Sequence, residues 1–186
     1  VADVDNDGVQ EVCAATGFAR GKAAVHIYRS SVPGTPLQLE QVINEDGRFG
    51  NVKFHIADLK GDGSRELTAW WITDIADGDC EMIRYELGPD GVRSRVRIAK
   101  GTSAELWPQD GQMVLGQDDA GRSLWFATNA GDLWRLDTAG AGRLIHVAYI
   151  NGGLGQLAVA PPQPGKPFEL FAGMQKQVVR IEKNRR

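Results

Sequence analysis

The sequence contains only two cysteines, Cys13 and Cys80, among its 186 residues. Two cysteines are too few to define a disulfide framework, so we expect unpaired thiols. The sequence also lacks any apolar run of the roughly 20 residues that a membrane-spanning helix needs. The longest apolar runs, such as residues 67–72, have the length of a single strand. We therefore expect no transmembrane segment.

Strong positive charge is missing as well. Lysine and arginine total 21 against 24 acidic residues, which gives a formal net charge of -3. The single basic cluster lies at residues 183–186, whereas nucleic-acid affinity depends on many clustered basic side chains. Nucleic acid is therefore excluded as the expected partner. What the sequence has instead is 42% hydrophobic residues and 23 glycines, which is typical of a globular, turn-rich protein.

Catalytic motifs are also lacking. There is no Gly-x-Ser-x-Gly elbow, and the glycines of residues 152–155 are not followed by the helix that a phosphate loop requires. The three histidines, His26, His55 and His146, are far apart and have no partner at metal-ligand spacing. We predict no catalytic and no cofactor-binding residues. If an active site exists, His55 is the residue to inspect, because it shortly precedes a cluster of acidic residues.

The most informative segment is residues 3–11, which read DVDNDGVQE. The carboxylates of Asp3, Asp5 and Asp7, the carbonyl of Val9 and the carboxylate of Glu11 form a set of oxygen ligands suited to Ca²⁺. The glycine permits a sharp turn. Because Asp, Asn and Gly also dominate ordinary turns, an acidic surface turn is the alternative.

A second copy of this segment lies 55 residues downstream. Its predicted ligands are Asp58, Asp62, Ser64 and Glu66, and Lys60 stands where the first segment has Asp5. The substitution removes one carboxylate and adds an ammonium group, so we expect weaker calcium binding here. Two alternatives remain open: Lys60 points outward and a water takes its place, or its ammonium substitutes for the ion.

Neither segment fits a helix-loop-helix calcium site, because the twelfth position of the first segment, which must be a glutamate there, is Ala14. The pattern Asp-x-Asp-x-Asp-Gly-x-x-Glu between apolar strands resembles the calcium loop of FG-GAP/VCBS repeats. These repeats form the β-propeller blades of integrin α-subunits and of many secreted bacterial proteins. The period of 55 residues is close to the length of such blades. The resemblance is specific only at residues 3–11 and 58–66.

Two further copies are degenerate. Residues 113–126 keep strand, acidic turn and strand without the ligand spacing, and residues 156–171 have a proline-rich turn in place of the acids. No segment shows a convincing helical period, so we expect hairpins throughout. The predicted strands include 11–15, 24–29, 37–43, 53–57, 66–73, 81–87, 92–99, 124–128, 133–137, 157–160, 168–172 and 177–182.

The expected fold class is therefore all-β. Specifically, we expect a single partial β-propeller domain over residues 1–186, with about four blades of four-stranded antiparallel sheet, as part of a larger, seven-bladed ring. The alternatives are a small four-bladed ring that closes alone and pairing with another chain. The approximate blades are residues 1–50, 51–111, 112–152 and 153–186. Because the sequence starts inside the first motif, we expect further sequence upstream, and the missing N-terminal blades are one candidate partner.

The five tryptophans are a second possible binding feature. Neighbouring residues of a strand point to opposite faces, so Trp70 and Trp71 cannot lie between the same two blades, and we expect one of them to be exposed. Trp107 is the other candidate for exposure. An exposed tryptophan would offer a stacking surface for a sugar, although most of the five are expected in the core.

The resemblance implies a calcium-stabilised binding or scaffold module that is secreted, periplasmic or at the cell surface, with a protein or carbohydrate partner. One alternative is a carbohydrate-active enzyme of the polysaccharide lyase or sugar dehydratase type, since relatives of this repeat occur there. Another is a structural subunit of a larger assembly. The only cofactor that we expect is Ca²⁺.

Overall fold

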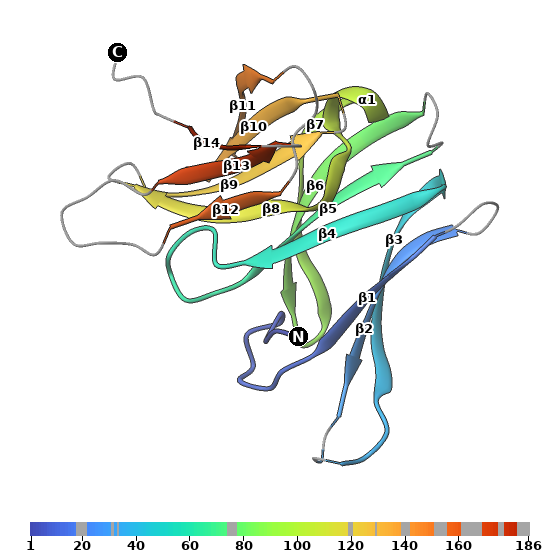
Figure 1. The fold of residues 1–186 in the computed structure, drawn as a ribbon. Coiled ribbons are helices and arrows are strands. Elements are labelled where there is room, and N and C mark those ends of the chain that lie inside the picture. The colour runs from blue at the N-terminus through green and yellow to red at the C-terminus, as the bar shows by residue number, and fades with distance from the viewer. Residues whose placement is uncertain are drawn as a thin grey trace. The chain divides into compact units, whose positions relative to one another are not determined.

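The structure, a computed structural model, describes residues 1–17, 22–30, 32, 34–73, 78–118, 121–128, 130–138, 142–150, 156–160, 169–174 and 177–181 (Figure 1). In these residues the chain is all-β, as expected, with one short helix, α1 (Ser103–Leu106). The chain forms two compact units. The first comprises residues 1–58 and 62–106, and the second comprises residues 59–61 and 107–186.

The first unit contains two antiparallel sheets in which sequential strands are neighbours. The three-stranded sheet has the order β1-β2-β3, and the four-stranded sheet has the order β4-β5-β6-β7. Their bounds are β1 Val12–Thr16, β2 Lys22–Arg29, β3 Gln38–Phe49, β4 Asn51–Ala57, β5 Glu66–Ile72, β6 Asp79–Gly88 and β7 Gly91–Thr102.

The second unit has the same kind of topology. Its four-stranded sheet has the order β11-β10-β9-β8, and its three-stranded sheet has the order β12-β13-β14. The bounds are β8 Pro108–Asp118, β9 Gly121–Thr128, β10 Asp132–Asp137, β11 Arg143–Tyr149, β12 Leu157–Val159, β13 Leu170–Met174 and β14 Gln177–Ile181.

The predicted strands are confirmed, and the main differences lie at their ends. β3 continues to Phe49 and β7 to Thr102, because each lies antiparallel to a long neighbour that supplies further ladder partners. β8 begins at Pro108, so the expected blade boundary between residues 111 and 112 falls inside this strand. The proline-rich turn of the last copy lies largely outside the described residues.

Apolar side chains from both sheets of the first unit form one core. The cluster includes Val25 and Ile27 of β2 and Trp71, Ile83 and Tyr85 of the other sheet. Burial of such side chains contributes about 1.5–3 kcal/mol each. The two sheets of this unit are therefore held face to face mainly by hydrophobic packing.

Polar contacts reinforce this packing at one edge. Glu45 of β3 accepts a hydrogen bond from the buried hydroxyl of Tyr85 at 2.6 Å, and it accepts two from Arg95 at 2.9 and 2.6 Å. Burial and the neighbouring carboxylate raise the pKa of Tyr85, so this hydroxyl remains a hydrogen-bond donor. In addition, the Gln41 amide donates to the carbonyl of Gly88 at 3.0 Å.

The second unit has its own apolar core. It joins Trp125 and Leu133 of one sheet to Leu157, Leu170 and Ala172 of the other. The guanidinium carbon of Arg135 lies 5.7 Å from the centre of the Trp125 ring, a cation–π contact. Within this unit, too, consecutive sheets pack through their apolar faces.

The expectation of an exposed tryptophan is wrong for the candidates that we named. Trp70 and Trp71 are fully buried and Trp107 is 7% exposed. Adjacent tryptophans can both be buried because every residue of β5 is buried, so this central strand is covered on both faces. These side chains belong to the core and offer no stacking surface for a sugar.

Neither cysteine forms a disulfide, as expected. Cys80 is fully buried, and burial raises the pKa of Cys13 to about 11. Since the thiolate is the reactive form, we expect both thiols of the folded chain to react with a disulfide reagent at pH 8 at least about 100-fold more slowly than free cysteine. The rate of thiol modification measures this, with the chain in denaturant as control. Prompt reaction of one thiol in the folded chain would contradict the burial described here.

Among the described residues, no helix is long and apolar enough to cross a membrane.

Candidate metal centre

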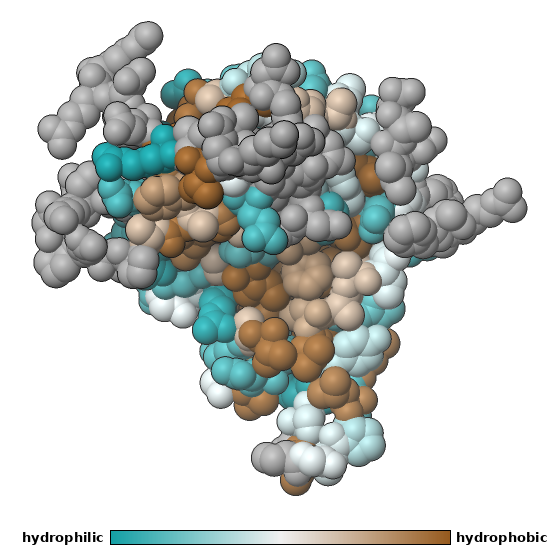
Figure 2. Space-filling view, viewed as in Figure 1, coloured by the Kyte–Doolittle hydropathy of each residue, from teal (hydrophilic) through white to brown (hydrophobic). Residues whose placement is uncertain are grey.

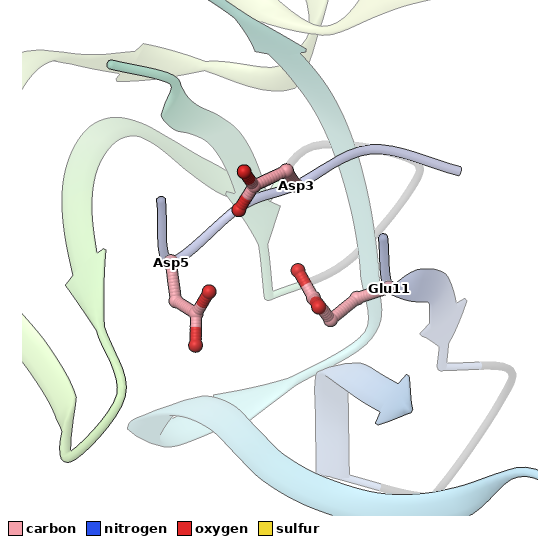
Figure 3. Close-up of side chains that lie close together, drawn as sticks. All are labelled: Asp3, Asp5 and Glu11. Atoms are coloured by element: carbon pink, nitrogen blue, oxygen red, sulfur yellow. The ribbon is translucent and has the colours of Figure 1, made fainter. Parts of the chain in front are cut away.

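The loop that precedes β1 brings together the carboxylates of Asp3, Asp5 and Glu11. One oxygen of each lies within 4.8 Å of the others, and Figure 3 shows the three side chains directed toward a common space. The chemistry fits a hard divalent cation because all three donors are carboxylate oxygens. Within the part of the chain that the structure describes, this is the group of three ionisable side chains that can share an ion.

The backbone of this loop is bent by residues with positive φ. Asn6 has φ 62° and Gly8 has φ 92°, a region that asparagine and glycine tolerate best. The bend directs amides inward, so that Gly8 N–H donates to Asp3 Oδ2 at 3.0 Å and Val9 N–H donates to Asp7 Oδ1 at 2.8 Å. The alternation of Asp with Asn and Gly thus produces a loop that folds around its own carboxylates.

Glu11 closes the loop from the inside. Its backbone pairs with Ala2 through hydrogen bonds of 3.0 and 2.8 Å, and its Oε2 accepts the amide of Val4 at 2.9 Å. The side chain is fully buried. Burial raises the pKa of Glu11, and the nearby charge of Asp5 adds to this effect, while the hydrogen bond from Val4 and the contact with Arg29 oppose it. A cation at this position would stabilise the ionised carboxylate.

Arg29, at the end of β2, supplies a positive charge that sequence reasoning missed. Its Nη2 lies 3.1 Å from Asp5 Oδ2, 2.5 Å from Asp7 Oδ2 and 3.3 Å from Glu11 Oε1, and its Nη1 lies 3.2 Å from Glu40. One guanidinium therefore serves four carboxylates, which leaves a formal excess of negative charge. The register of β1 and β2 would have identified Arg29 as a partner of the loop. Val12 pairs with Tyr28, so Glu11 lies opposite Arg29.

The predicted ligands of the first loop have different positions. Asp3, Asp5 and Glu11 share one space, whereas the Asp7 carboxylate contacts Arg29 and the amide of Val9. The hydrogen bond from Val9, followed by the contact with Arg29, lowers the pKa of Asp7 despite an opposing effect of burial. Val9 is 40% exposed. The structure thus groups three of the four carboxylates that the sequence singles out.

The second loop has the same backbone hydrogen bonds 55 positions later. Gly63 N–H donates to Asp58 Oδ2 at 3.1 Å, and Ser64 N–H donates to Asp62 Oδ1 at 2.8 Å. Gly61 and Gly63, which align with Asn6 and Gly8, also have positive φ. The two loops therefore have matching local geometry.

The charges of the second loop are arranged differently. Its acids are not among the described groups that could share an ion, and Lys60, which stands at the third position, is exposed. Glu66 is buried and pairs in the ladder with Glu86, so that an acid faces it where Arg29 faces Glu11. Compared with the first loop, Lys60 replaces the carboxylate of Asp5, and the carboxylate of Glu86 stands where the first loop has the guanidinium of Arg29.

A direct hydrogen bond connects the two loops. The amide of Arg65 donates to Asn6 Oδ1 at 2.9 Å, although the two residues are 59 positions apart. The side chain of Asn6 is thus engaged outside its own loop.

The histidines do not form a catalytic group with one another. His55 is largely buried in β4, and this burial lowers its pKa. His146 contacts Asp132 at 2.7 Å and lies edge-on to Trp134. His26 contacts the hydroxyl of Thr16 at 3.1 Å. Each histidine therefore has a separate local environment.

No protein family model, curated protein or solved structure matches the chain.

Proposed function

We propose that the chain is part of a calcium-stabilised β-propeller of the FG-GAP/VCBS kind, and that it serves as a binding or scaffold module for a protein or glycan. The topology supports the architecture, because each unit consists of consecutive antiparallel meanders that pack face to face. The matching hydrogen bonds of the two loops, 55 residues apart, support a repeated blade. On this proposal, each sheet is one blade of a larger ring.

One observation carries the assignment of calcium to the first loop. Asp5 and Glu11 are almost completely buried, their carboxylates lie close to that of Asp3, and the single guanidinium of Arg29 leaves negative charge unbalanced. A buried carboxylate stays ionised only where positive charge or hydrogen bonds compensate it, and otherwise it retains a proton. Ca²⁺ fits best because it accepts many oxygen ligands in a flexible geometry, whereas Mg²⁺ requires a stricter octahedral shell.

The proposed role of the ion is structural. Calcium would bind the carboxylates that precede β1 and so fix the start of the first sheet against the second. Such a site works best where calcium is plentiful, which favours a secreted, periplasmic or cell-surface location. The binding partner would then meet the surface that this fixed scaffold presents.

Calcium removal tests the proposal. A ligand that binds only the folded chain stabilises it by about 2.7 kcal/mol when present at 100 times its Kd, so we expect Ca²⁺ to raise the melting temperature of the chelator-treated chain by several degrees. Differential scanning calorimetry with and without calcium measures the shift, and an equal concentration of Mg²⁺ is the control. A melting temperature that is the same with calcium and with chelator would overturn the assignment.

A further inference from the structure

The last two strands of the four-stranded sheet in the second unit carry a group of aromatic and ionisable side chains. β10 pairs with the edge strand β11, and their ladder aligns Asp132 with Tyr149 and Trp134 with His146. Asp132 and Trp134 are two positions apart, so their side chains lie on the same face of the sheet. Cross-strand partners share a face as well. These side chains therefore form one cluster, the β10–β11 cluster, at the end of the sheet where β10 begins.

A β-bulge in β11 makes this arrangement possible. The pairing shifts between Leu133 and Trp134, so Val147 is an extra residue without a partner in this ladder. His146 and Tyr149 are three positions apart, and side chains with this spacing point to opposite faces of a regular strand. The extra residue returns both to the same face. Bulges often re-aim side chains in this way next to active sites.

Asp132 and His146 form the polar half of the cluster. Nε2 of His146 lies 2.7 Å from Oδ1 of Asp132, and the imidazole is the donor because an ionised carboxylate only accepts hydrogen bonds. Within the described part of the chain, Oδ2 of Asp132 and Nδ1 of His146 have no partner. The two side chains are 21% and 45% exposed. A ligand can therefore reach one acceptor oxygen and one ring nitrogen from the solvent.

Tyr149 and Trp134 form the aromatic half. Tyr149 is 61% exposed, and its ring packs over Gly131, where a Cβ atom would lie 3.6 Å from ring carbon Cε2. Trp134 meets the ring of His146 edge-on, with 4.8 Å between the centroids. Figure 2 shows hydrophobic and hydrophilic surface next to each other over the part of the molecule in which β10 and β11 lie in Figure 1. An open aromatic surface thus lies beside a carboxylate.

The backbone around the cluster is fixed by hydrogen bonds. Gly131 N–H donates to the carbonyl of Thr128 at 3.0 Å, and Ile150 N–H donates to the carbonyl of Gly131 at 2.9 Å. The amide of Asp132 donates to the hydroxyl of Thr128, which is fully buried, at 3.3 Å. A site held on paired strands in this way binds a ligand without first having to become ordered.

We propose that the β10–β11 cluster is a binding site for a neutral sugar, a single pyranose unit of a glycan. The inference rests on the proposed function as a binding module and names the class of its ligand. The ring of Tyr149 packs against the C–H face of the pyranose. One sugar hydroxyl donates to Oδ2 of Asp132, and another contacts Nδ1 of His146. The carboxylate repels acidic sugars such as uronates.

The small size of the cluster favours a sugar over a protein. A stable protein interface buries about 800 Å² on each partner and involves about 20–30 residues on each side. The cluster consists of two aromatic and two ionisable side chains, which matches the few, precisely placed polar groups of a small-molecule site. One pyranose ring is large enough to contact the ring of Tyr149 and the carboxylate of Asp132 together.

A titration followed by ¹H–¹⁵N NMR tests the site in the full chain. The probes are methyl β-D-glucopyranoside, methyl β-D-galactopyranoside and the acidic counterpart of the first, methyl β-D-glucuronide. We expect the amide signals of Asp132, Trp134, His146 and Tyr149 to shift and to saturate with at least one neutral probe, with a Kd of about 1 mM. The glucuronide should bind at least about tenfold more weakly than the glucoside.

Variants show whether the cluster makes the contacts. Tyr149→Ala should raise the Kd about tenfold, whereas Tyr149→Phe, which keeps the ring, should change it by less than about twofold. Asp132→Asn should weaken binding of the neutral sugars about tenfold and also abolish the discrimination against the glucuronide, an effect that loss of structure does not produce. Val178→Ala, at a residue that is 72% exposed on β14, is the control and should bind like the wild type. The amide spectrum outside the cluster shows whether each variant is folded.

Three results would overturn the proposal: no saturable shift at the cluster with either neutral sugar, shifts that persist unchanged in folded Tyr149→Ala and Asp132→Asn, or shifts at the cluster that depend on the concentration of the chain without sugar. The last result would assign the cluster to contact between copies of the chain. Titrations are made both in calcium and in chelator. A chain that binds sugar without responding to calcium contradicts only the calcium site, and one that responds to calcium without binding sugar contradicts only this inference.

Discussion

Replacement of Arg29 by methionine is expected to lower the free energy of unfolding of the calcium-free chain by about 3 kcal/mol. The guanidinium contacts Asp5 and Glu11, whose side chains are 2% and 0% exposed. Removal of one partner of a buried ion pair costs about 3–5 kcal/mol, and the lower value applies because Arg29 itself is 23% exposed. Methionine keeps most of the apolar stem, so the loss of charge dominates. Denaturant unfolding in chelator measures the change.

Calcium should reverse this loss, at least in part. In the variant Arg29→Met a bound Ca²⁺ supplies the positive charge that Asp5 and Glu11 no longer receive from the side chain. It also binds without repulsion from a guanidinium, so the affinity is expected to rise about tenfold or more, which corresponds to about 1.4 kcal/mol. Calorimetric titration of the variant and of the wild type with calcium gives both affinities.

Lys100→Met is the matched control. The Lys100 side chain is 52% exposed, and its Nζ lies 3.0 Å from Oδ2 of Asp79, whose side chain is 56% exposed. Exposed ion pairs of this kind contribute about 0–1 kcal/mol, so this variant should unfold close to the wild type and bind calcium with the same affinity. If Arg29→Met behaves like the control, the guanidinium is not the counter-ion of the loop.

The contrast between the loop and Arg29 shows how far the sequence is informative. The loop is a local structure: carboxylates at alternate positions, with Asn6 and Gly8 where φ is positive, determine its hydrogen bonds within a few residues. Arg29 comes from the far end of the hairpin partner and reaches Glu11 only through the register of β1 and β2. Its role could be deduced once that register was known, but a motif search confined to residues 3–11 cannot find it.

The burial of side chains in the sheets was also harder to predict, because it depends on segments that are distant in the sequence. Alternation assigns Trp70 and Trp71 to opposite faces, but it does not say whether one face or both are covered. β5 lies in the interior of its sheet and both its faces are covered, so both side chains are in the core. Residues 69–72 of β5 form a continuous apolar run, which is the sequence signal for a strand that is buried on both faces.

Replacement of Glu11 by glutamine is expected to abolish most of the response to calcium. The side chain is fully buried, and its carboxylate is one of the three that lie within 4.8 Å of one another. Glutamine keeps the size and an oxygen that can accept the amide of Val4, so the loop should fold, but one of three negative charges is lost. We expect calcium affinity to fall about 100-fold, or by about 2.7 kcal/mol. Calorimetric titration measures the loss.

The same variant has a pH signature in the absence of calcium. Burial raises the pKa of Glu11 in the folded chain above its ordinary value of 4.5. Well below pH 4.5 the group is protonated in both states, so it makes no pH-dependent contribution to stability. As the pH rises through the interval between the unfolded and the folded pKa, the folded chain retains a proton that the unfolded chain has released, so the wild type loses stability. Glu11→Gln lacks this loss.

In chelator, therefore, the stability of Glu11→Gln relative to the wild type should increase from pH 4 to pH 7. With saturating calcium the order should invert, because the ion stabilises the ionised carboxylate of the wild type and metal binding requires a deprotonated ligand. Denaturant unfolding at both pH values, with and without calcium, gives the four differences. If the difference in chelator stays constant with pH, burial does not raise the pKa of Glu11. If the inversion fails, its carboxylate is not a calcium ligand. A structural calcium site in the first loop requires both results. The ion stabilises the fold because it offsets the free-energy cost of burying the ionised carboxylate of Glu11.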